Sequence, residues 1–387
     1  MIKLYDTDSY INEFNANVIS CEKNGDNGYR IILDQTAFFP TAGGQTCDTG
    51  VIGKERVLDV IIENEIIIHI TENPIDVGET VTCRIDWDAR FRKMQHHSAE
   101  HIVSGIATRI FECNNVGFHL SDKEVTIDYD KEFTESDLLL LEQKANEAIW
   151  NNLEIDARYP DDDELAKIPY RAKLDLTENV RIVTIPGIDI CACCAPHVKR
   201  TGEIGVIKLK DMMRHRGGVR IRMICGRDAL FDYQEKAKSV LSISNLLSAR
   251  QEEVAEATEN LLSQVNDKNR KIAELSRELA VLKAESVLET NGNICVFADN
   301  SDTETLRLLA NILNKKTPKL ACVLSGNAER GYRYIIASER VNLRDISKDI
   351  NSSLNGRGGG REDMIQGSFS ASKVDIEKYF EEFLKEE

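Results

Sequence analysis

Two short patterns far apart in the sequence carry the residues best suited to metal chemistry. His97 and His101 stand four residues apart, and Cys193 and His197 repeat that spacing. In a helix this spacing places two side chains on one face, one turn apart. Three imidazoles and one thiolate form a ligand set that zinc accepts readily. We therefore predict a zinc site formed by these four residues.

The thiol of this site has close neighbours in the sequence. Cys191, Cys193 and Cys194 compete for one position, and the four-residue spacing to His197 favours Cys193. Four protein ligands would close a tetrahedral shell and make the zinc structural. Three ligands plus water would make it catalytic, because the metal lowers the pKa of its bound water. The sequence is compatible with both.

A zinc protease of the H-E-x-x-H type is not indicated. The glutamate of that motif directly follows the first histidine, and this chain has Ser98 at that position. Glu100 instead precedes the second histidine, and we expect it on another part of the helix surface. His119 offers a further imidazole near these segments, and a structural role is the simpler interpretation for it.

The same segments resemble the motifs of one known family. Residues 92–101 resemble the "HSATH" helix of the editing domain of alanyl-tRNA synthetase, and residues 193–198 resemble its "CGGTHV" turn. Residues 36–50 resemble its "T-x-FYP-x-GGGQ-x-x-DxG" loop, and residues 356–367 resemble the "GGGRPDMAQGG" signature of its DHH-associated domain. We expect no aminoacylation domain before these motifs. The resemblance is therefore to freestanding alanyl-tRNA editing proteins of the long AlaX type.

This resemblance implies a zinc-dependent ester hydrolase that deacylates mischarged seryl-tRNA(Ala) and spares alanyl-tRNA(Ala). It assigns Thr36 a contact with the serine hydroxyl and places Gln45 at the substrate end. A pocket whose polar group stays unpaired with the wrong substrate discriminates strongly. The resemblance also assigns tRNA binding to the carboxy-terminal domain, where guanidinium groups and bare amides suit phosphate. The predicted tRNA-binding residues are Arg357, Gly358, Gly359, Gly360 and Arg361.

Two departures from the family motifs leave alternatives open. Ala42 replaces the first glycine of the loop, and residues 194–196 read Cys-Ala-Pro where the family has Gly-Gly-Thr. One alternative is a tRNA-binding protein with a relic, non-catalytic editing domain. Another is a metal-dependent hydrolase of a different small ester or nucleotide. The predicted zinc ligands together with Thr36 and Gln45 favour the editing hydrolase.

The elements that must position these residues predict an α+β chain of four parts. Short β-branched runs between Asn, Gly and Pro residues predict a small β-barrel over residues 1–88. Residues 89–232 begin with helical periodicity, then mix strands and helices, and carry the zinc site as an α/β editing core. Residues 290–387 predict an α/β domain in which a glycine-rich loop precedes the terminal helix.

Residues 233–289 follow a different pattern, because apolar residues recur every seven positions. This repeat predicts a helical coiled-coil segment. A hairpin that packs on itself and a long dimeric rod fit the pattern equally, so a homodimer could form through this segment or the carboxy-terminal domain. The repeat is filled by Val240, Leu247, Val254, Leu261, Leu275 and Leu282.

Composition restricts the broad class of protein. The 387 residues suit two or three domains, and 42% hydrophobic with 29% charged residues is ordinary for a globular chain. No apolar run reaches membrane-spanning length, and the start lacks a signal-peptide pattern, so we expect a cytoplasmic protein. The net charge of −16 argues against a general nucleic-acid binder. A local basic patch within residues 208–227 could still hold tRNA.

Overall fold

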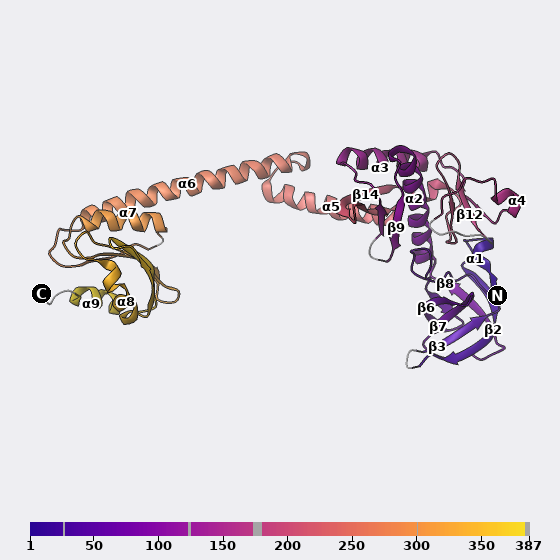
Figure 1. Cartoon of the computed structure of the whole chain (residues 1–387), viewed down its shortest axis with the longest axis horizontal. Coiled ribbons are helices and arrows are strands. Elements are labelled where there is room, and N and C mark those ends of the chain that lie inside the picture. The colour runs from indigo at the N-terminus through magenta and orange to yellow at the C-terminus, as the bar shows by residue number, and fades with distance from the viewer. Residues whose placement is uncertain (26–27, 123–124, 173–179, 300, 384–387) are drawn as a thin grey trace. The chain divides into compact units, whose positions relative to one another are not determined.

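The computed structural model describes residues 1–25, 28–122, 125–172, 180–299 and 301–383 (Figure 1). It divides into two compact units, Met1–Leu241 and Ser242–Glu387. Both units combine sheets with helices, so the mixed α+β class is confirmed. The finer division of the chain at residues 88, 232 and 289 stays a proposal.

The first unit begins with a closed six-stranded barrel. On β8 the residues alternate, so that Val81, Cys83 and Ile85 are buried while their neighbours are exposed. This period of two fills the barrel interior with apolar side chains. A short parallel pair outside the barrel joins β1 (Ile2–Lys3) to β4 (Gln35–Thr36). The barrel order is β2 (Glu13–Lys23), β3 (Tyr29–Leu33), β7 (Ile66–Thr71), β6 (Glu55–Glu63), β5 (Gly50–Ile52) and β8 (Thr80–Ile85).

Helix α2 (Trp87–Phe111) follows β8 and forms the centre of the rest of this unit (Figure 1). Asp86 starts it by accepting a hydrogen bond from the amide of Ala89, and Glu112 ends it in the left-handed region at φ 52°. Residues 93–107 are buried on every side, as in a helix enclosed by its neighbours. A Cβ on Gly105 would lie 2.5 Å from the carbonyl oxygen of Ile188. The helix therefore packs directly against the segment that leads into β13.

Two sheets surround this helix. The first has the order β14 (Ile207–His215), β15 (Gly218–Cys225), β10 (Val125–Tyr129) and β9 (Asn115–Leu120). The second has the order β11 (Asp156–Arg158), β12 (Ile182–Ile185) and β13 (Asp189–Ala192). Helix α3 (Glu135–Trp150) and three short helical elements complete this part of the unit, and the short elements are α1 (Leu4–Thr7), α4 (Asp162–Leu165) and η1 (Thr201–Ile204).

The segment predicted as a coiled coil is helical but interrupted. Helix α5 (Gly226–Leu247) ends before Ser248, whose φ is 51°, and η2 (Gln251–Glu253) precedes α6 (Val254–Ser286). Coiled-coil pairing stays a prediction, and no helix in the described ranges is long and apolar enough to cross a membrane. Apolar side chains of α6 that are 45% to 62% exposed are Leu261, Leu262, Val265, Ile272, Leu275, Leu279 and Leu282.

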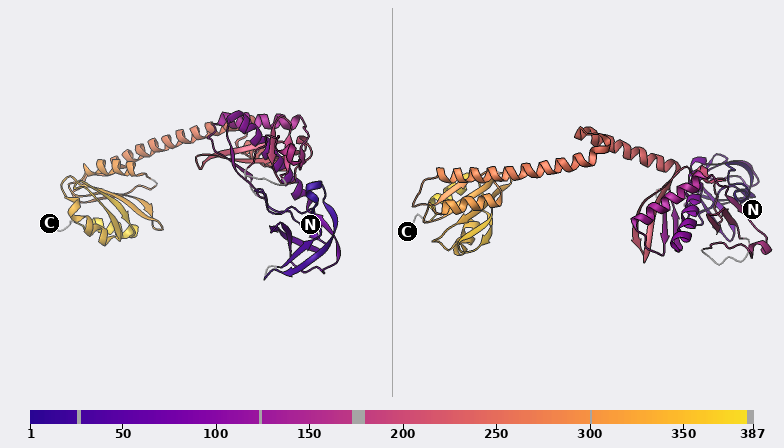
Figure 2. Two further views of the ribbon diagram at one scale, coloured as in Figure 1. Left: turned by 45° about the vertical axis from the view of Figure 1, so that its right-hand side comes forward. Right: turned by 90° about the horizontal axis from the view of Figure 1, so that it is seen from above.

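The second unit is built on a five-stranded sheet with helices on both faces. The end of α6 and helix α7 (Thr303–Asn314) lie side by side over one face (Figure 2). Helices α8 (Leu343–Ser353) and α9 (Lys373–Glu382) close the apolar core on the other. The strand order is β16 (Ile294–Phe297), β17 (Ala321–Asn327), β18 (Gly331–Ala337), β20 (Met364–Phe369) and β19 (Gly356–Gly360).

The prediction of a glycine-rich loop is wrong, because residues 356–360 form the edge strand β19. A Cβ on Gly358 would lie 2.4 Å from the hydroxyl of Tyr334, and one on Gly360 would lie 2.3 Å from the carbonyl oxygen of Met364. These glycines therefore permit close packing of a strand, where the sequence pattern indicated a turn. A Cβ on Gly359 would meet nothing within 4 Å.

Candidate metal centre and its pocket

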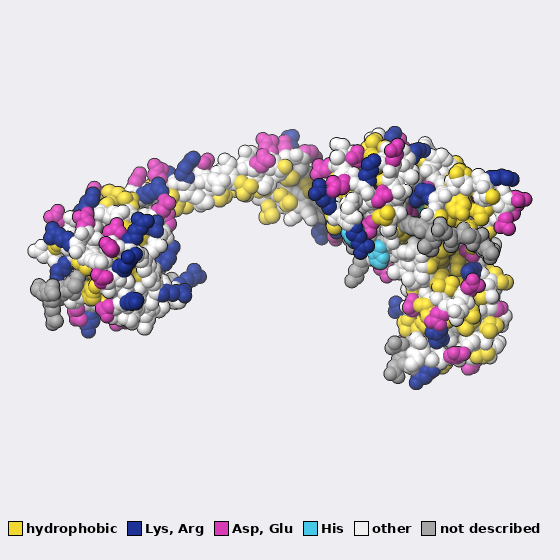
Figure 3. Space-filling model, in the orientation of Figure 1, with side chains coloured by type: hydrophobic (Ala, Val, Ile, Leu, Met, Phe, Trp, Pro, Cys, Tyr) yellow, Lys and Arg dark blue, Asp and Glu magenta, His cyan; other side chains and the backbone are white. Residues whose placement is uncertain are grey.

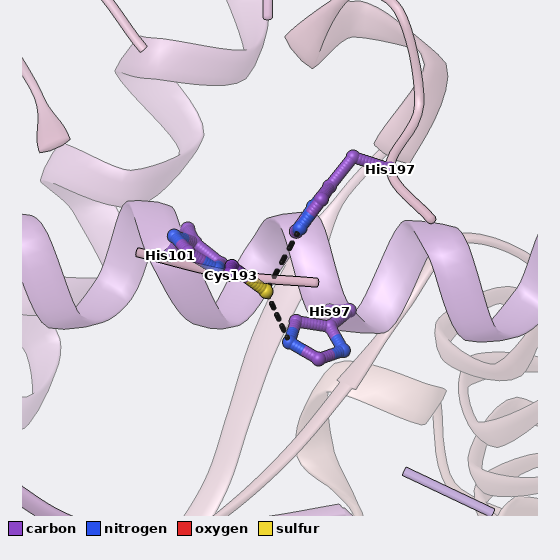
Figure 4. A group of neighbouring side chains, drawn as sticks. All are labelled: His97, His101, Cys193 and His197. Carbon is purple, nitrogen blue, oxygen red and sulfur yellow. Dashed lines mark hydrogen bonds between the residues drawn. The ribbon is translucent and has the colours of Figure 1, made fainter. Parts of the chain in front are cut away.

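The structure brings the four predicted metal ligands together (Figure 4). His97 and His101 lie one turn apart on α2, with their rings stacked at a centroid distance of 5.6 Å. Cys193 directly follows β13, and its Sγ lies 3.4 Å from Nε2 of His97 and 3.4 Å from Nε2 of His197. All four ligand atoms lie within 4.8 Å of one another.

Each histidine of the cluster is fixed by a hydrogen bond at its other ring nitrogen. Because Nδ1 is engaged in all three rings, Nε2 is the nitrogen available to a metal, as in most protein metal sites. Of the three side chains that provide these bonds, the sequence analysis assigned only Gln45 a role in the site. The Nδ1 partners are Oε1 of Gln45 for His97 at 3.0 Å, Oδ2 of Asp189 for His101 at 2.9 Å, and Oγ of Ser98 for His197 at 3.1 Å.

The pKa values of the three neighbouring thiols favour Cys193 as the ligand. Burial opposes ionisation of Cys193, but its electrostatic interactions with the imidazoles of His97 and His197 hold its pKa well below the usual value. Burial raises the pKa of Cys191 to about 11, and it also raises the pKa of Cys194 to about 11. Since the thiolate is the metal-binding form, Cys193 is the thiol prepared for a metal.

The donor set and its geometry fit zinc. Three imidazole nitrogens and one thiolate sulfur point at a common centre from α2 and from the segment after β13 (Figure 4), and such a set suits a tetrahedral site. A second group, His101, Asp189 and Cys191, also lies close together. Both carboxylate oxygens of Asp189, however, already accept hydrogen bonds from Arg171 at 2.7 Å. Asp189 therefore supports His101 and does not compete for the metal.

A pocket of about 580 Å³ opens beside this cluster. Its wall is formed by the loop over residues 36–50 (the glycine loop), by α2, by β9 and by the segment around β13. Apolar contact comes from Phe118, whose ring centroid lies 4.9 Å from that of His97. Positive charge comes from lysine and arginine side chains, and the described lining residues include one carboxylate. The lining includes Lys3, Gly43, Gly44, Glu100, Phe118, Tyr159, Arg171, Arg181 and Cys194 together with His97, His101 and Cys193.

The loop over residues 36–50 is held against β9 at the edge of this pocket. Gly44 has φ 79°, and its carbonyl oxygen accepts a hydrogen bond from the amide of Leu120 at 2.7 Å. A Cβ on Gly44 would lie 2.5 Å from the carbonyl oxygen of Phe118, so only glycine fits there. Asp48 accepts hydrogen bonds from the buried guanidinium of Arg90 on α2. The loop is thereby fixed to the helix that carries the histidines.

The structure places Thr36 on β4, with its hydroxyl against His69 of the barrel strand β7. It is fully buried, and its Oγ1 lies 2.8 Å from Nε2 of His69. Burial lowers the pKa of His69 to about 4, so this imidazole is neutral at pH 7. Thr36 is not among the described residues that line the pocket. Its predicted contact with a serine hydroxyl stays a prediction.

Glu100 is a pocket residue that the sequence analysis placed elsewhere on the helix. That expectation was wrong, because Glu100 lines the same pocket as His97 and is only 4% exposed. The spacing contained the signal, since residues three apart on a helix share a face. Asp189 and Ser98 were also missed. No residue pattern in the sequence predicts their roles, because these roles depend on contacts between distant segments.

The predicted basic patch over residues 208–227 is largely neutralised. Lys208 pairs with Glu142 at 2.8 Å, and Arg220 pairs with Asp128 at 2.7 Å. On the visible face of this unit, basic side chains are interspersed with acidic ones (Figure 3). His119 is exposed on β9, outside the ligand cluster. In the second unit Arg357 and Arg361 are exposed at β19.

Three protein-family models match separate parts of the chain. Residues 180–222, which hold Cys193 and His197, match the threonyl and alanyl tRNA synthetase second additional domain. Residues 6–89 match the tRNA synthetases class II (A). Residues 291–386 match the DHHA1 domain. Together they cover the barrel, the metal-binding turn and the second unit's sheet.

Full-length relatives match nearly the whole chain. The alanyl-tRNA editing protein AlaX-L of Pyrococcus horikoshii is 27% identical, over 97% of this chain and 96% of that protein. The alanyl-tRNA editing protein Aarsd1 of Mus musculus is 26% identical, over 95% of this chain and 94% of that protein. The alanine--tRNA ligase of Methanobrevibacter smithii is 29% identical over 92% of this chain, which corresponds to 42% of that enzyme.

Proposed function

The chain belongs to the family of alanyl-tRNA editing proteins, and from this premise we propose that it hydrolyses mischarged seryl-tRNA(Ala) while sparing alanyl-tRNA(Ala). The observation that carries the proposal is the convergence of three imidazoles and one thiolate beside a pocket of about 580 Å³. A pocket of this size accommodates an aminoacyl group and part of the nucleotide that carries it.

We infer that zinc binds at His97, His101, Cys193 and His197. When bound, the metal supplies a fixed positive charge at the pocket wall, where it polarises or positions the aminoacyl group. The chain's own residues keep this centre in place. Gln45, Asp189 and Ser98 orient the three imidazoles through their Nδ1 atoms. Loss of any one of them leaves a ligand free to rotate.

The reaction is the addition of water to the ester carbonyl carbon. The bond from that carbon to the ribose oxygen breaks, the ribose hydroxyl takes up a proton, and the amino acid leaves as a carboxylic acid. The glycine loop supports this step by allowing the backbone at Gly43 and Gly44 to reach the pocket. Nε2 of Gln45 is buried and has no hydrogen-bond partner among the described residues. It therefore keeps a donor for a substrate oxygen, in support of its predicted place at the substrate end.

We further propose that the second unit holds the body of the tRNA. With a net charge of −16, the whole protein repels a polyanion unless a dedicated basic surface binds it. Arg357 and Arg361 are exposed at the edge strand β19 and could supply such contacts. Because aminoacylated tRNA is the proposed substrate, a cytoplasmic location is part of this proposal.

The direct test is to incubate the purified protein with seryl-tRNA(Ala) and alanyl-tRNA(Ala) and to follow loss of each ester. We expect release of serine well above the spontaneous rate and no comparable release of alanine. Binding of both tRNAs without hydrolysis would favour the relic editing domain. Absence of both binding and hydrolysis would favour a hydrolase of another small ester or nucleotide.

A further inference from the structure

We propose that the carboxylate of Glu100 binds the α-ammonium group of the aminoacyl ester, an inference that rests on the proposed function. Glu100 stands on α2 between the two histidine ligands. It is 4% exposed and lines the pocket. The carboxylate thus lies at the pocket wall beside the metal ligands, where the aminoacyl end of the substrate must enter.

The charges around the pocket leave Glu100 as the group suited to a cation. Among the described lining residues it is the one carboxylate, while Lys3, Arg171 and Arg181 are positive. Asp189 lies behind His101, where it is engaged by that histidine and by Arg171. A bound zinc would add further positive charge. Among the described lining residues, Glu100 is therefore the one whose charge attracts an ammonium group.

The substrate carries such a cation. An aminoacyl ester keeps its α-amino group free, and α-amino groups titrate near pH 8, so most are protonated at pH 7. A carboxylate that accepts a hydrogen bond from an ammonium in a buried site gives a stronger contact than a neutral pair does. The same contact would exclude esters whose amino group is blocked, such as the peptidyl esters of tRNA.

Neighbouring side chains hold the Glu100 carboxylate in one orientation. Its Oε1 accepts a hydrogen bond from Oγ of Ser104 at 2.7 Å and another from Nδ2 of Asn115. Ser104 is in turn 3.0 Å from the hydroxyl of Tyr129. The second oxygen, Oε2, lies 3.9 Å from Nε2 of His101. The group is fixed in advance beside the metal ligands, so little ordering is needed when a cation arrives.

The test compares Glu100→Gln with the unchanged protein on seryl-tRNA(Ala) and on its N-acetyl form, which lacks the charge. Glutamine keeps an acceptor for Ser104 and Asn115 while the negative charge is lost. We expect the unchanged protein to prefer the free amine by roughly tenfold to hundredfold in kcat/KM. In Glu100→Gln this preference should disappear because kcat/KM for the free-amine substrate falls. The fall should come more from a raised KM than from a lowered kcat. The variant's rate on the N-acetyl substrate should stay the same.

Three further measurements separate this role from a structural one. Zinc content should be equal in Glu100→Gln and the unchanged protein. Calorimetry with the non-hydrolysable amide 3′-seryl-amino-3′-deoxyadenosine should show the same loss of preference over its N-acetyl derivative. The control Asp88→Asn, on the exposed first turn of α2, should behave as the unchanged protein does.

Equal losses on the free and the acetylated substrate would overturn the proposal, as would an unchanged preference in Glu100→Gln. Either result leaves the proposed function intact, because the unchanged protein still cleaves seryl-tRNA(Ala). If the unchanged protein cleaves neither substrate and binds neither amide, the proposed function itself fails.

Discussion

Asp189 accepts a hydrogen bond from Nδ1 of His101 at 2.9 Å while Arg171 binds both oxygens of the same carboxylate. The hydrogen bond between Asp189 and His101 joins the start of β13 to the middle of α2, and the two residues are 88 positions apart in the sequence. Burial opposes ionisation of Asp189, but His101 and Arg171 lower its pKa to about 2. A charged carboxylate thus stands behind a metal ligand and fixes which nitrogen of His101 faces the centre.

Replacing Asp189 with asparagine should weaken zinc binding by about 10-fold to 100-fold, the usual effect of losing such a partner. Asparagine preserves the shape but removes the charge that supports the imidazole. Competition with a chromophoric chelator measures the affinity. Asp156→Asn on β11 is the matched control, since the ion-pair partner of Asp156 among the described residues is the exposed Arg158. Equal affinities in the two variants would show that the carboxylate does not support the metal.

The second prediction concerns the thiol ligand. Cys193→Ala should lose most of its zinc, because it removes the one thiol in the cluster whose pKa is lowered. Cys191→Ala and Cys194→Ala should each keep about one zinc per chain, the content of a single tetrahedral site. Metal analysis of the three purified variants shows which of the three thiols binds the zinc. Full retention in Cys193→Ala, with loss in a neighbour, would assign the site to the other thiol.

The ligands could be predicted from sequence because their spacing is local. A separation of four residues reports a shared face in a helix whatever surrounds it, as for His97 and His101. Cys193 and His197 have the same separation but lie in a segment without helix after β13, so helical geometry does not explain that pair. The supports of these ligands could not be predicted in this way. Asp189 and Gln45 reach their histidines only after distant segments have packed together, and a single sequence records no such contact.

Two expectations drawn from the sequence were wrong, and they concern the glycine run and Glu100. The glycine run at residues 356–360 was interpreted as a loop because glycine is common in turns, whereas close packing against Tyr334 requires it in β19. Glu100 was expected on a different surface because it directly precedes His101, and adjacent residues on a helix point in different directions. Its three-residue separation from His97 was the more informative relation. For the glycine run the packing partner, which the sequence does not name, decided the outcome, whereas for Glu100 the informative spacing was present in the sequence.

The third prediction concerns pH and His69. An unfolded imidazole titrates near 6.5, whereas burial lowers the pKa of His69 to about 4. Between these values the unfolded chain binds a proton that the folded chain does not, so stability is complete above pH 6.5 and falls as the pH drops toward 4. A difference of this size corresponds to about 3 kcal/mol. Denaturant unfolding from pH 7 to pH 4 should show a smaller decline in His69→Gln. An equal decline of the free energy of unfolding in His69→Gln and the unchanged protein would contradict this role of His69.

The fourth prediction decides the role of Thr36. Thr36→Val removes the hydroxyl next to Nε2 of His69 and leaves that buried nitrogen unpaired, at a cost of about 1–3 kcal/mol in the free energy of unfolding. If Thr36 also contacts the serine hydroxyl, the ratio of seryl to alanyl hydrolysis falls as well. Because its hydroxyl already binds His69, we expect the stability loss with an unchanged ratio. A fall in the ratio at full stability would restore Thr36 to the substrate contact.

The last prediction concerns tRNA binding by the second unit. Arg357 on β19 and Arg361 directly after it are four residues apart, so their side chains leave the same face of an extended segment. At this edge the amide of Arg361 donates to the carbonyl oxygen of Met364, which keeps the segment paired. Two guanidinium groups on one face, spaced about 13 Å along the strand, suit two phosphates of one backbone.

Replacing both arginines with glutamine should weaken tRNA binding and reduce its dependence on salt. Each lost phosphate contact releases about one counterion fewer, so the slope of log affinity against log salt should fall by about 1 to 2. Hydrolysis at saturating enzyme should stay the same, because the metal ligands are untouched. Lys268→Gln, on the exposed face of α6, is the control for loss of a positive charge away from β19. An identical salt slope in the arginine variant and the unchanged protein would remove β19 from the tRNA-binding surface, and recognition would then have to come from the first unit.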